Sequence, residues 1–316
     1  MKAFLTDPAA GPSVSGAPAV LPRRRFLVIH NPVAGARRGR YLRTTLDVLA
    51  QRYGASVTVQ ATTGRGDAES LARSLIPGAY DAVAVAGGDG TINEAVNGLA
   101  ARSPEEAVIP LGVVPLGTAN VLAHELGLPL DPAGTAGVLA MGAERLIHPG
   151  VANGRCFVMM AGAGLDAQVV ERVDPGIKRL IGKGAYVLET VRQLVSARGR
   201  RFRVSVDGRS RDVASVIVAN GHFYGGTFVC APDACLTDPR LHVCLFPGMG
   251  RWNAVRYVWG VTAGRLKHFR DYSIVPAERV IIEGEPGEAI QGDGDVIARV
   301  PAEIAVSPRT LPVLAG

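Results

Sequence analysis

The sequence predicts two domains, a doubly wound α/β domain followed by a mainly antiparallel β domain. Over residues 26–126, short apolar runs alternate with helical patterns, which is typical of parallel strands joined by crossover helices. Past residue 148, Asn-Gly and Asp-Gly pairs lie between short runs, which indicates β-hairpins. A chain of 316 residues is long enough for two modest domains.

Four segments are expected along the chain. Residues 1–22 are rich in Pro, Ala, Gly and Ser and lack the apolar core of a signal peptide, so we predict a disordered tail. Residues 23–147 are expected to form the α/β domain and residues 148–306 the β-rich domain. Residues 307–316 are a C-terminal segment that is a candidate for returning to the first domain.

The first domain opens with a strand over 26–29 and a helix over 41–53, followed by a strand over 56–60. The loop between the first strand and the first helix carries glycines and arginines, which favours nucleotide binding over a plain solvated loop. Asp67 is predicted to cap the next helix. A buried strand over 108–114 and a helix over 117–126 follow, closed by Gly127 and Pro129.

Between these elements lies the stretch that organises the chain, residues 81–99. A run rich in Val and Ala predicts a buried strand, and Gly87-Gly88-Asp89-Gly90 predicts a tight turn. Thr91 is predicted to cap a helix whose apolar residues share one face. A glycine-rich turn before a helix N-terminus binds anions. Asp89 beside it indicates a metal or a proton transfer, and the alternative is a turn whose Asp caps the helix.

In the second half, hairpins are predicted at 152–155 and 206–209, beside runs at 156–160 and 213–219. Two segments, 177–197 and 251–259, mix basic with apolar residues, and both tryptophans of the chain lie in the second. Such segments suit contact with a membrane surface, and packing on the β domain is the alternative.

Composition limits the function classes. The hydrophobic content is 47% and the charged content 20%, and no apolar run reaches about 18 residues, so a globular cytoplasmic protein is expected. The net charge of +6 and the pI near 9.4 favour an anionic partner. Zinc-finger and RNA-recognition patterns are lacking, which argues against nucleic acid. The cysteines lack paired zinc spacing, so core thiols in a reducing compartment are favoured; they are Cys156, Cys230, Cys235 and Cys244.

Three motifs carry a resemblance to a known family. They are Asn31-Pro32-Val33-Ala34-Gly35, Gly87-Gly88-Asp89-Gly90-Thr91, and Pro115-Leu116-Gly117-Thr118-Ala119-Asn120. In this order they resemble the bacterial diacylglycerol-kinase-like family, within the superfamily that includes sphingosine and ceramide kinases. NAD kinases and phosphofructokinases carry a similar turn. The resemblance implies an NAD-kinase-like or diacylglycerol-kinase-like nucleotide domain, a C-terminal β-sandwich-like domain, and the use of ATP and Mg²⁺.

The resemblance also implies site residues. Asp89 would orient metal-bound phosphates or accept the proton, the second role being that of the sphingosine-kinase branch. Asp295 stands where the bacterial family has a Glu that acts as general base. The implied nucleotide-binding residues are Asn31, Pro32, Gly35, Thr62, Gly87, Gly88, Gly90, Thr91, Gly117, Thr118 and Asn120.

A structural Mg²⁺ site is implied in the second domain, with Asp238 and the carbonyls of Cys235 and Arg240 as ligands. Pro239 departs from the family's Gly there and forbids positive φ. Ala34 stands where the family often has Ser. Val121 stands where many diacylglycerol-kinase relatives have Asp, which favours a sphingoid or ceramide-like acceptor without settling the choice.

The sequence therefore predicts an ATP-dependent lipid kinase with its active site between the domains. The expected partners are a lipid substrate and, peripherally, a membrane surface, and an exposed sheet edge leaves a homodimer open. Two alternatives stay open, a kinase of a soluble substrate of the NAD-kinase type and a non-catalytic nucleotide sensor.

Overall fold

The computed structural model describes residues 22–34, 38–106, 108–164, 167 and 201–316. The first domain is built on one six-stranded sheet. Its strands β2, β1, β3 and β4 are parallel, while β20 pairs parallel with β4 and antiparallel with β5. The strand order is β2 (Ser56–Ala61), β1 (Arg25–His30), β3 (Ala82–Gly87), β4 (Leu111–Pro115), β20 (Leu311–Ala315), β5 (Ala143–Ile147).

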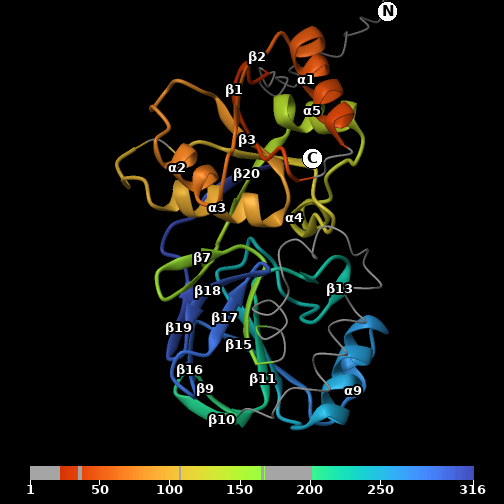
Figure 1. Ribbon diagram of the computed structural model, residues 1–316, viewed down its shortest axis with the longest axis vertical. Helices are drawn as coiled ribbons and strands as arrows, with labels where there is room; N and C mark the ends of the chain where they lie inside the picture. Colours follow the sequence, from red (N-terminus) through yellow and green to blue (C-terminus); the bar gives the residue numbers. More distant parts are fainter. Residues whose placement is uncertain (1–21, 35–37, 107, 165–166, 168–200) are drawn as a thin grey trace, which may run out of the picture.

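Helices cover both faces of this sheet (Figure 1). On one face α1 (Gly39–Tyr53) and α5 (Pro132–Met141) pack against alternate strand residues such as Phe26. On the other face α2 (Asp67–Arg73) and α3 (Asp89–Ala100) pack against residues such as Leu27. Because both faces are covered, β3 and β4 are buried along their whole length. This arrangement confirms the predicted α/β domain.

The second domain is a sandwich of two sheets whose described strand pairings are antiparallel. Side chains such as Phe202, Val218 and Ile304 fill the space between the sheets. One sheet has the order β10 (Arg209–Val213), β9 (Phe202–Val206), β16 (Arg279–Glu283), β19 (Ala302–Val306), β6 (Gly150–Ala152), β7 (Arg155–Phe157). The other has the order β15 (Ser273–Ala277), β14 (Leu241–Phe246), β11 (Ser215–Ala219), β8 (Met160–Ala163), β17 (Ala289–Gly292), β18 (Asp295–Arg299).

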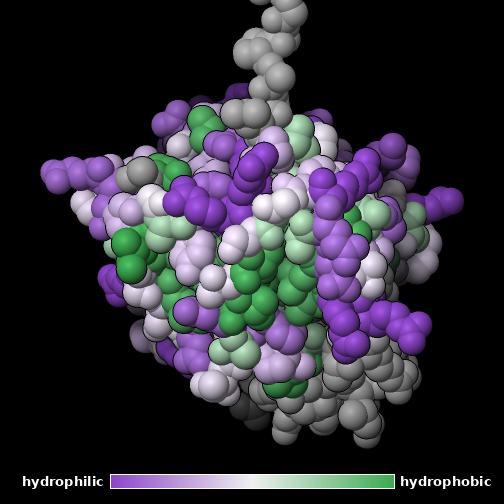
Figure 2. Space-filling view, turned by 90° about the horizontal axis from the view of Figure 1, so that it is seen from above, coloured by the Kyte–Doolittle hydropathy of each residue, from purple (hydrophilic) through white to green (hydrophobic). Residues whose placement is uncertain are grey.

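Smaller elements lie outside the sandwich. The strands β12 (Phe223–Tyr224) and β13 (Phe228–Val229) form a short ribbon, and α9 (Arg251–Thr262) is followed by the 3₁₀ helix η1 (Leu266–His268). In Figure 1, α9 lies at the side of the second domain, away from the first sheet. Figure 2 views the molecule from above, onto the end formed by the first domain. This face shows a hydrophobic patch near the middle of the view, with hydrophilic side chains around it.

Both predicted hairpins are confirmed. Asn153-Gly154 connects β6 to β7, and Asp207-Gly208 connects β9 to β10. All four turn residues have positive φ, from 44° to 86°, as a two-residue hairpin turn of this type requires.

Several boundaries differ from the predictions. Gly88, not Thr91, is the N-cap of α3, because Asp89 and Gly90 already belong to the helix. The helix predicted over 117–126 is only α4 (Val121–Glu125), since Asn120 has a left-handed backbone with φ of 49°. Asp67 does not cap α2. Its carboxylate instead accepts hydrogen bonds from the N–H groups of Thr63 and Gly64 and so closes the preceding turn.

Two further differences concern burial and coverage. The strand predicted from residue 108 begins at Leu111, and Val108 is exposed. Cys235 is exposed, so the prediction of a core thiol is wrong for this one cysteine, while Cys156, Cys230 and Cys244 are buried. The predicted helical segment 177–197 lies outside the described residues, as do residues 1–21 of the tail that was predicted over residues 1–22.

Candidate active site between the two domains

The loops that follow β1, β3 and β4 meet at the carboxyl edge of the first sheet, where parallel α/β sheets bind ligands. The N–H of Asn31 donates to the carbonyl of Ala86 over 2.9 Å, and its side-chain amide donates to the hydroxyl of Thr91 over 2.9 Å. The N–H of Gly117 donates to the carbonyl of Gly87 over 3.1 Å. Residues of all three motifs therefore contact one another.

Glycine is required where two of these loops touch. A Cβ atom on Gly117 would lie 2.6 Å from the Cα of Gly88, and one on Gly87 would lie 2.8 Å from the Cβ of Thr91. Both distances are shorter than side chains tolerate, so a larger residue at position 117 would separate the two loops, and one at position 87 would displace Thr91 in the first turn of α3. The glycines therefore keep the backbones of two motifs in direct contact.

The N-terminus of α3 points a set of N–H groups into this region. Its N-cap is Gly88, which has no side chain and so makes no side-chain capping hydrogen bond. The helix dipole favours an anion at such an end. The atom nearest to a Cβ on Gly90 is a carboxylate oxygen of Asp295, 3.2 Å away, so the second domain borders the same turn.

Asp89 is turned toward the next helix. Its Oδ1 accepts the N–H of Val121 over 2.8 Å and that of Leu122 over 3.4 Å, so its carboxylate caps α4 from the start of α3. Burial raises the pKa of the Asp89 carboxyl, while the backbone N–H groups act in the opposite direction. Asp89 thus joins the glycine-rich turn to the helix that follows the third motif.

Asn120 carries an unpartnered polar atom. The residue is buried, and its Oδ1 has no hydrogen-bond partner within the described part of the chain. An unpaired buried carbonyl oxygen is costly, so a ligand donor at this position would be favourable. Asn120 adjoins Gly117, whose Cβ position is 2.8 Å from this oxygen. The buried oxygen therefore lies beside the glycine contact and fits a nucleotide donor group.

The remaining predicted nucleotide residues lie around this centre. Thr62 is buried at the end of β2, and its N–H donates to the carbonyl of His30 over 2.8 Å. Pro32 and Thr118 are exposed on their loops. Gly35 lies outside the described residues.

Asp295 begins β18 and is bound by a residue of the other domain. The guanidinium of Arg65, from the loop before α2, forms an ion pair with Oδ1 of Asp295. Both side chains are accessible to solvent. A carboxylate and a guanidinium therefore face each other at the solvent-exposed side of the glycine-rich turn.

The sequence analysis missed Asp293, a carboxylate of the site that accepts four hydrogen bonds. It accepts the N–H groups of Val158, Met159 and Met160 over 2.6 to 3.1 Å and the side-chain amide of Asn93 over 2.8 Å. Burial raises its pKa, and these N–H donors oppose the shift. Asp293 also occupies the β17–β18 turn with φ of 51°, two residues before Asp295, and so fixes where that hairpin ends.

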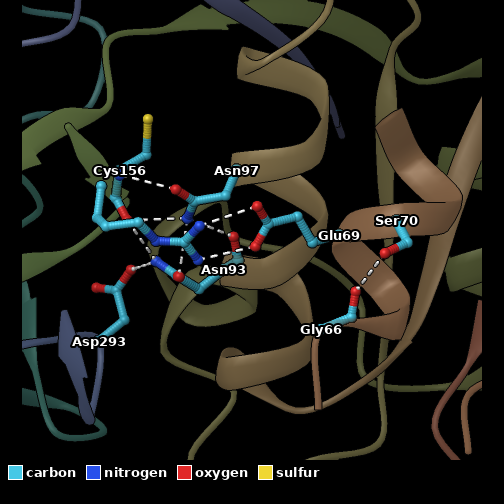
Figure 3. A network of polar contacts seen from close by, with 8 residues as sticks. Gly66, Glu69, Ser70, Asn93, Asn97, Cys156 and Asp293 are labelled. Carbon is cyan, nitrogen blue, oxygen red and sulfur yellow. Dashed lines mark hydrogen bonds and ion pairs between the residues drawn. The ribbon is translucent and has the colours of Figure 1, made fainter. Parts of the chain in front are cut away.

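A polar network around Asp293 joins the two domains (Figure 3). The side-chain amides of Asn93 and Asn97 on α3 both donate to the carbonyl of Cys156 over 3.0 Å. The backbone N–H of Cys156 in turn donates to Oδ1 of Asn97 over 2.9 Å. Glu69 on α2 accepts two hydrogen bonds of 2.9 Å from the guanidinium of Arg155. The sequence feature that could have predicted this network is the pair Asn93 and Asn97, which lie one turn apart on an otherwise apolar helix face.

The predicted metal ligands are arranged differently. Both carboxylate oxygens of Asp238 accept from the guanidinium of Arg240, at 2.8 to 3.2 Å. The carbonyl of Cys235 accepts the N–H of Asp238 over 3.0 Å. Because the carboxylate already has a cationic partner, these residues do not fit a Mg²⁺ ion in this arrangement. We therefore assign no metal to this position.

Comparison with known proteins gives a consistent result. The diacylglycerol kinase catalytic domain family matches residues 25–152, and the YegS C-terminal NAD kinase beta sandwich-like domain family matches residues 159–315. A diacylglycerol kinase of Bacillus subtilis is 31% identical over 89% of this chain and 92% of its own length. A diacylglycerol kinase of Mycobacterium tuberculosis is 31% identical over 78% of this chain and 81% of its own length. The crystal structure of a diacylglycerol kinase from Bacillus anthracis is 25% identical, with a TM-score of 0.75 over 93% of this chain and 98% of that one.

Proposed function

The chain belongs to the diacylglycerol kinase family, and we propose that this lipid kinase transfers the γ-phosphate of ATP to the hydroxyl group of a lipid. The observation that carries the proposal is the position of the Asp295 carboxylate, which lies 3.2 Å from where a Cβ on Gly90 would be and therefore next to a helix N-terminus that favours anions. Phosphoryl transfer needs these two parts side by side, one to hold phosphates and one to accept a proton.

The nucleotide would lie along the three converging loops. The N–H groups at the start of α3 would hold its phosphates, with Gly88 and Gly117 allowing close approach. The buried Oδ1 of Asn120 would accept a hydrogen bond from another part of the nucleotide. Asn31, Thr62, Thr91 and Thr118 border this space as further candidate contacts.

Asp295 is our candidate for the general base. The lipid hydroxyl oxygen would attack the γ-phosphorus while the bond from that phosphorus to the bridging oxygen breaks, so that ADP leaves. The hydroxyl proton would pass to the carboxylate of Asp295. Asp89 is less suited to this role, because its Oδ1 already accepts two backbone N–H groups of α4.

The residues next to the turn also fit Mg²⁺. This ion is held in kinases mainly by phosphates, water and one or two carboxylates, and Asp89 and Asp295 are the carboxylates that flank Gly90. When bound, Mg²⁺ supplies neutralisation of the phosphate charge. Arg65, paired with Asp295, is a second positive group at the same position.

The acceptor is proposed from the relatives and from one residue. The relatives are named diacylglycerol kinases, which makes a diacylglycerol-like lipid the first candidate. Val121, the first residue of α4, favours a sphingoid or ceramide-type lipid instead, because the chain lacks a carboxylate at that position. Both are lipids with a free hydroxyl group.

Transfer of labelled γ-phosphate to lipids in mixed micelles tests the proposal. The acceptors would be diacylglycerol, sphingosine, ceramide and phosphatidylglycerol, with NAD as a soluble acceptor. Asp295→Asn and Asp89→Asn are each expected to lower the rate at least about 100-fold. Asp47→Asn, at an exposed position on α1, is the matched control and should keep the full rate. Product with NAD alone would refute lipid transfer, and ATP binding without any product would favour a sensor.

Membrane association and self-association complete the proposal. In the described residues, no helix is long and apolar enough to cross a bilayer, so the enzyme would meet its lipid at the surface. The exposed edge strand β2 would be a candidate for pairing in a homodimer. Light scattering at increasing protein concentration, with and without lipid micelles, measures both.

A further inference from the structure

The outer face of α9 carries two exposed aromatic side chains. Trp252 is 76% exposed and Trp259 is 52% exposed. They are seven residues apart, which is two helical turns, so they lie on the same face of the helix. These are the only tryptophans in the chain. Large exposed aromatic residues that share one face mark an interaction surface.

The surroundings of α9 are strongly basic. Residues 239–270 contain no Asp or Glu. The basic residues of this stretch, apart from histidines, are Arg240, Arg251, Arg256, Arg265, Lys267 and Arg270. A partner of this surface must therefore be apolar in one part and negatively charged in another.

A cleft of about 460 Å³ lies beside α9 and is lined in part by Arg211 and Arg270. The carboxylates in its wall are already paired, Asp212 with two other arginines and Asp271 with Arg256. Among the described residues, the side chains of Arg211 and Arg270 have no hydrogen-bond or ion-pair partner. The cleft thus presents two guanidinium groups that are free to bind an anion such as a phosphate.

Side-chain contacts connect the cleft to the helix. Asp271, in the cleft wall, accepts the hydroxyl of Tyr257 on α9 over 2.6 Å and also pairs with Arg256 on the same helix. At the other end, the guanidinium of Arg201 contacts the sulfur of Met249 just before α9, at 3.5 Å. Arg201 in turn pairs with Asp212 of the cleft. These contacts keep the position of α9 fixed relative to the two free guanidinium groups.

We propose that α9 and this cleft are a docking surface for an anionic phospholipid bilayer. Trp252 and Trp259 enter the interfacial layer, where tryptophan is favoured, and Arg211 and Arg270 bind phosphate groups of the lipid headgroups. Charge complementarity selects this partner, because the surface combines two exposed tryptophans with two unpaired guanidinium groups, and its carboxylates, Asp212 and Asp271, are already paired with arginines. The inference rests on the proposed function in that the lipid acceptor is located in such a bilayer.

Tryptophan fluorescence tests the docking surface directly, because both tryptophans report on α9. Vesicles of phosphatidylglycerol and phosphatidylcholine are expected to shift the emission to shorter wavelength, and brominated lipid is expected to quench it. Pure phosphatidylcholine vesicles should give a much weaker response, because they carry no net charge. If the anionic vesicles caused neither a shift nor quenching of the emission, the proposal would be overturned.

Vesicle sedimentation separates the two parts of the surface. The double variant Arg211→Gln/Arg270→Gln should bind anionic vesicles about 30-fold more weakly. The double variant Arg43→Gln/Arg73→Gln has the same change in net charge at exposed sites of the first domain, and should stay within about threefold of the parent. Trp252→Ala/Trp259→Ala should weaken binding even to vesicles of high charge.

Equal binding by the two arginine double variants would also overturn the proposal. Because these measurements use no ATP, they are independent of turnover. Phosphate transfer to lipids in detergent micelles is measured separately. Transfer without vesicle binding would contradict only the docking surface, whereas absence of transfer would contradict the proposed function.

Discussion

Arg65 and Asp295 form an ion pair that connects the two domains directly beside Gly90. The two residues are 230 positions apart in the chain. Because both side chains are accessible to water, the pair contributes little to the free energy of unfolding. A nucleotide phosphate carries more negative charge than a carboxylate, so it would compete for the guanidinium and release Asp295 for proton transfer.

Arg65→Ala is therefore expected to lower kcat/KM for ATP by about tenfold, with most of the change in KM. Arg65→Lys should restore part of the loss, because it keeps the charge but not the planar guanidinium. Steady-state kinetics at saturating lipid measures both variants, and Arg73→Ala, at an exposed position on α2, is the control. Unchanged kinetics in Arg65→Ala would show that this guanidinium contacts no phosphate.

Asp293→Asn should destabilise the protein by about 2 to 4 kcal/mol at pH 7.5. The carboxylate accepts four N–H groups, and an amide would turn its own NH₂ toward some of them. Asp295→Asn, only two residues away but accessible to solvent, should leave the free energy of unfolding within about 0.5 kcal/mol of the parent. Urea unfolding followed by circular dichroism distinguishes them. Similar stabilities for the two variants would contradict the assigned role of Asp293.

Acid should weaken the loop that carries Arg65. The hydroxyl and N–H of Thr63 and the N–H of Gly64 hold the pKa of Asp67 below its ordinary value. A carboxyl group whose pKa is lowered by folding stabilises the protein above its unfolded pKa of about 3.9, and this contribution is lost as the pH falls below that value. The difference in melting temperature between the parent and Asp67→Ala should therefore be constant above about pH 5 and shrink below about pH 4. A difference that does not change with pH would contradict this assignment.

Chelation of metal should separate activity from stability. Asp238 is paired with Arg240, so removal of divalent ions should leave the melting temperature within about 1 °C of its original value. The same treatment should abolish phosphate transfer, which added Mg²⁺ should restore. A fall of several degrees in melting temperature on chelation, reversed by Mg²⁺, would show that the second domain binds a structural ion after all.

The local features of the first domain could be predicted because they depend on nearby residues. Buried runs such as β3 and the glycine-rich turn after it have strong patterns over fewer than ten residues. Helix starts were less predictable. Thr91 has the chemistry of an N-cap, yet it is the third residue of α3, because Gly88 takes the extended conformation that begins the helix. The backbone conformation of Gly88 depends on its contact with Gly117, which is distant in the sequence.

The contacts between the domains could not be predicted in the same way. Asp293 belongs to a turn that, by its sequence, is typical of solvated carboxylates. It becomes buried only when the hairpin of β17 and β18 packs against Asn93 and the backbone of residues 158–160. The partners of Asp295 and Asp238 likewise follow from three-dimensional placement, Arg65 in one case and Arg240 in the other.

The position of β20 has a consequence for how the protein is made. This strand lies between β4 and β5, although the whole second domain separates it from them in the chain. While the ribosome is still producing the second domain, the nascent chain therefore holds β4 and β5 with unpaired edges. A chaperone that covers these edges during translation would protect the chain from aggregation. A fragment that stops near residue 150 would keep them exposed and should accumulate as insoluble material.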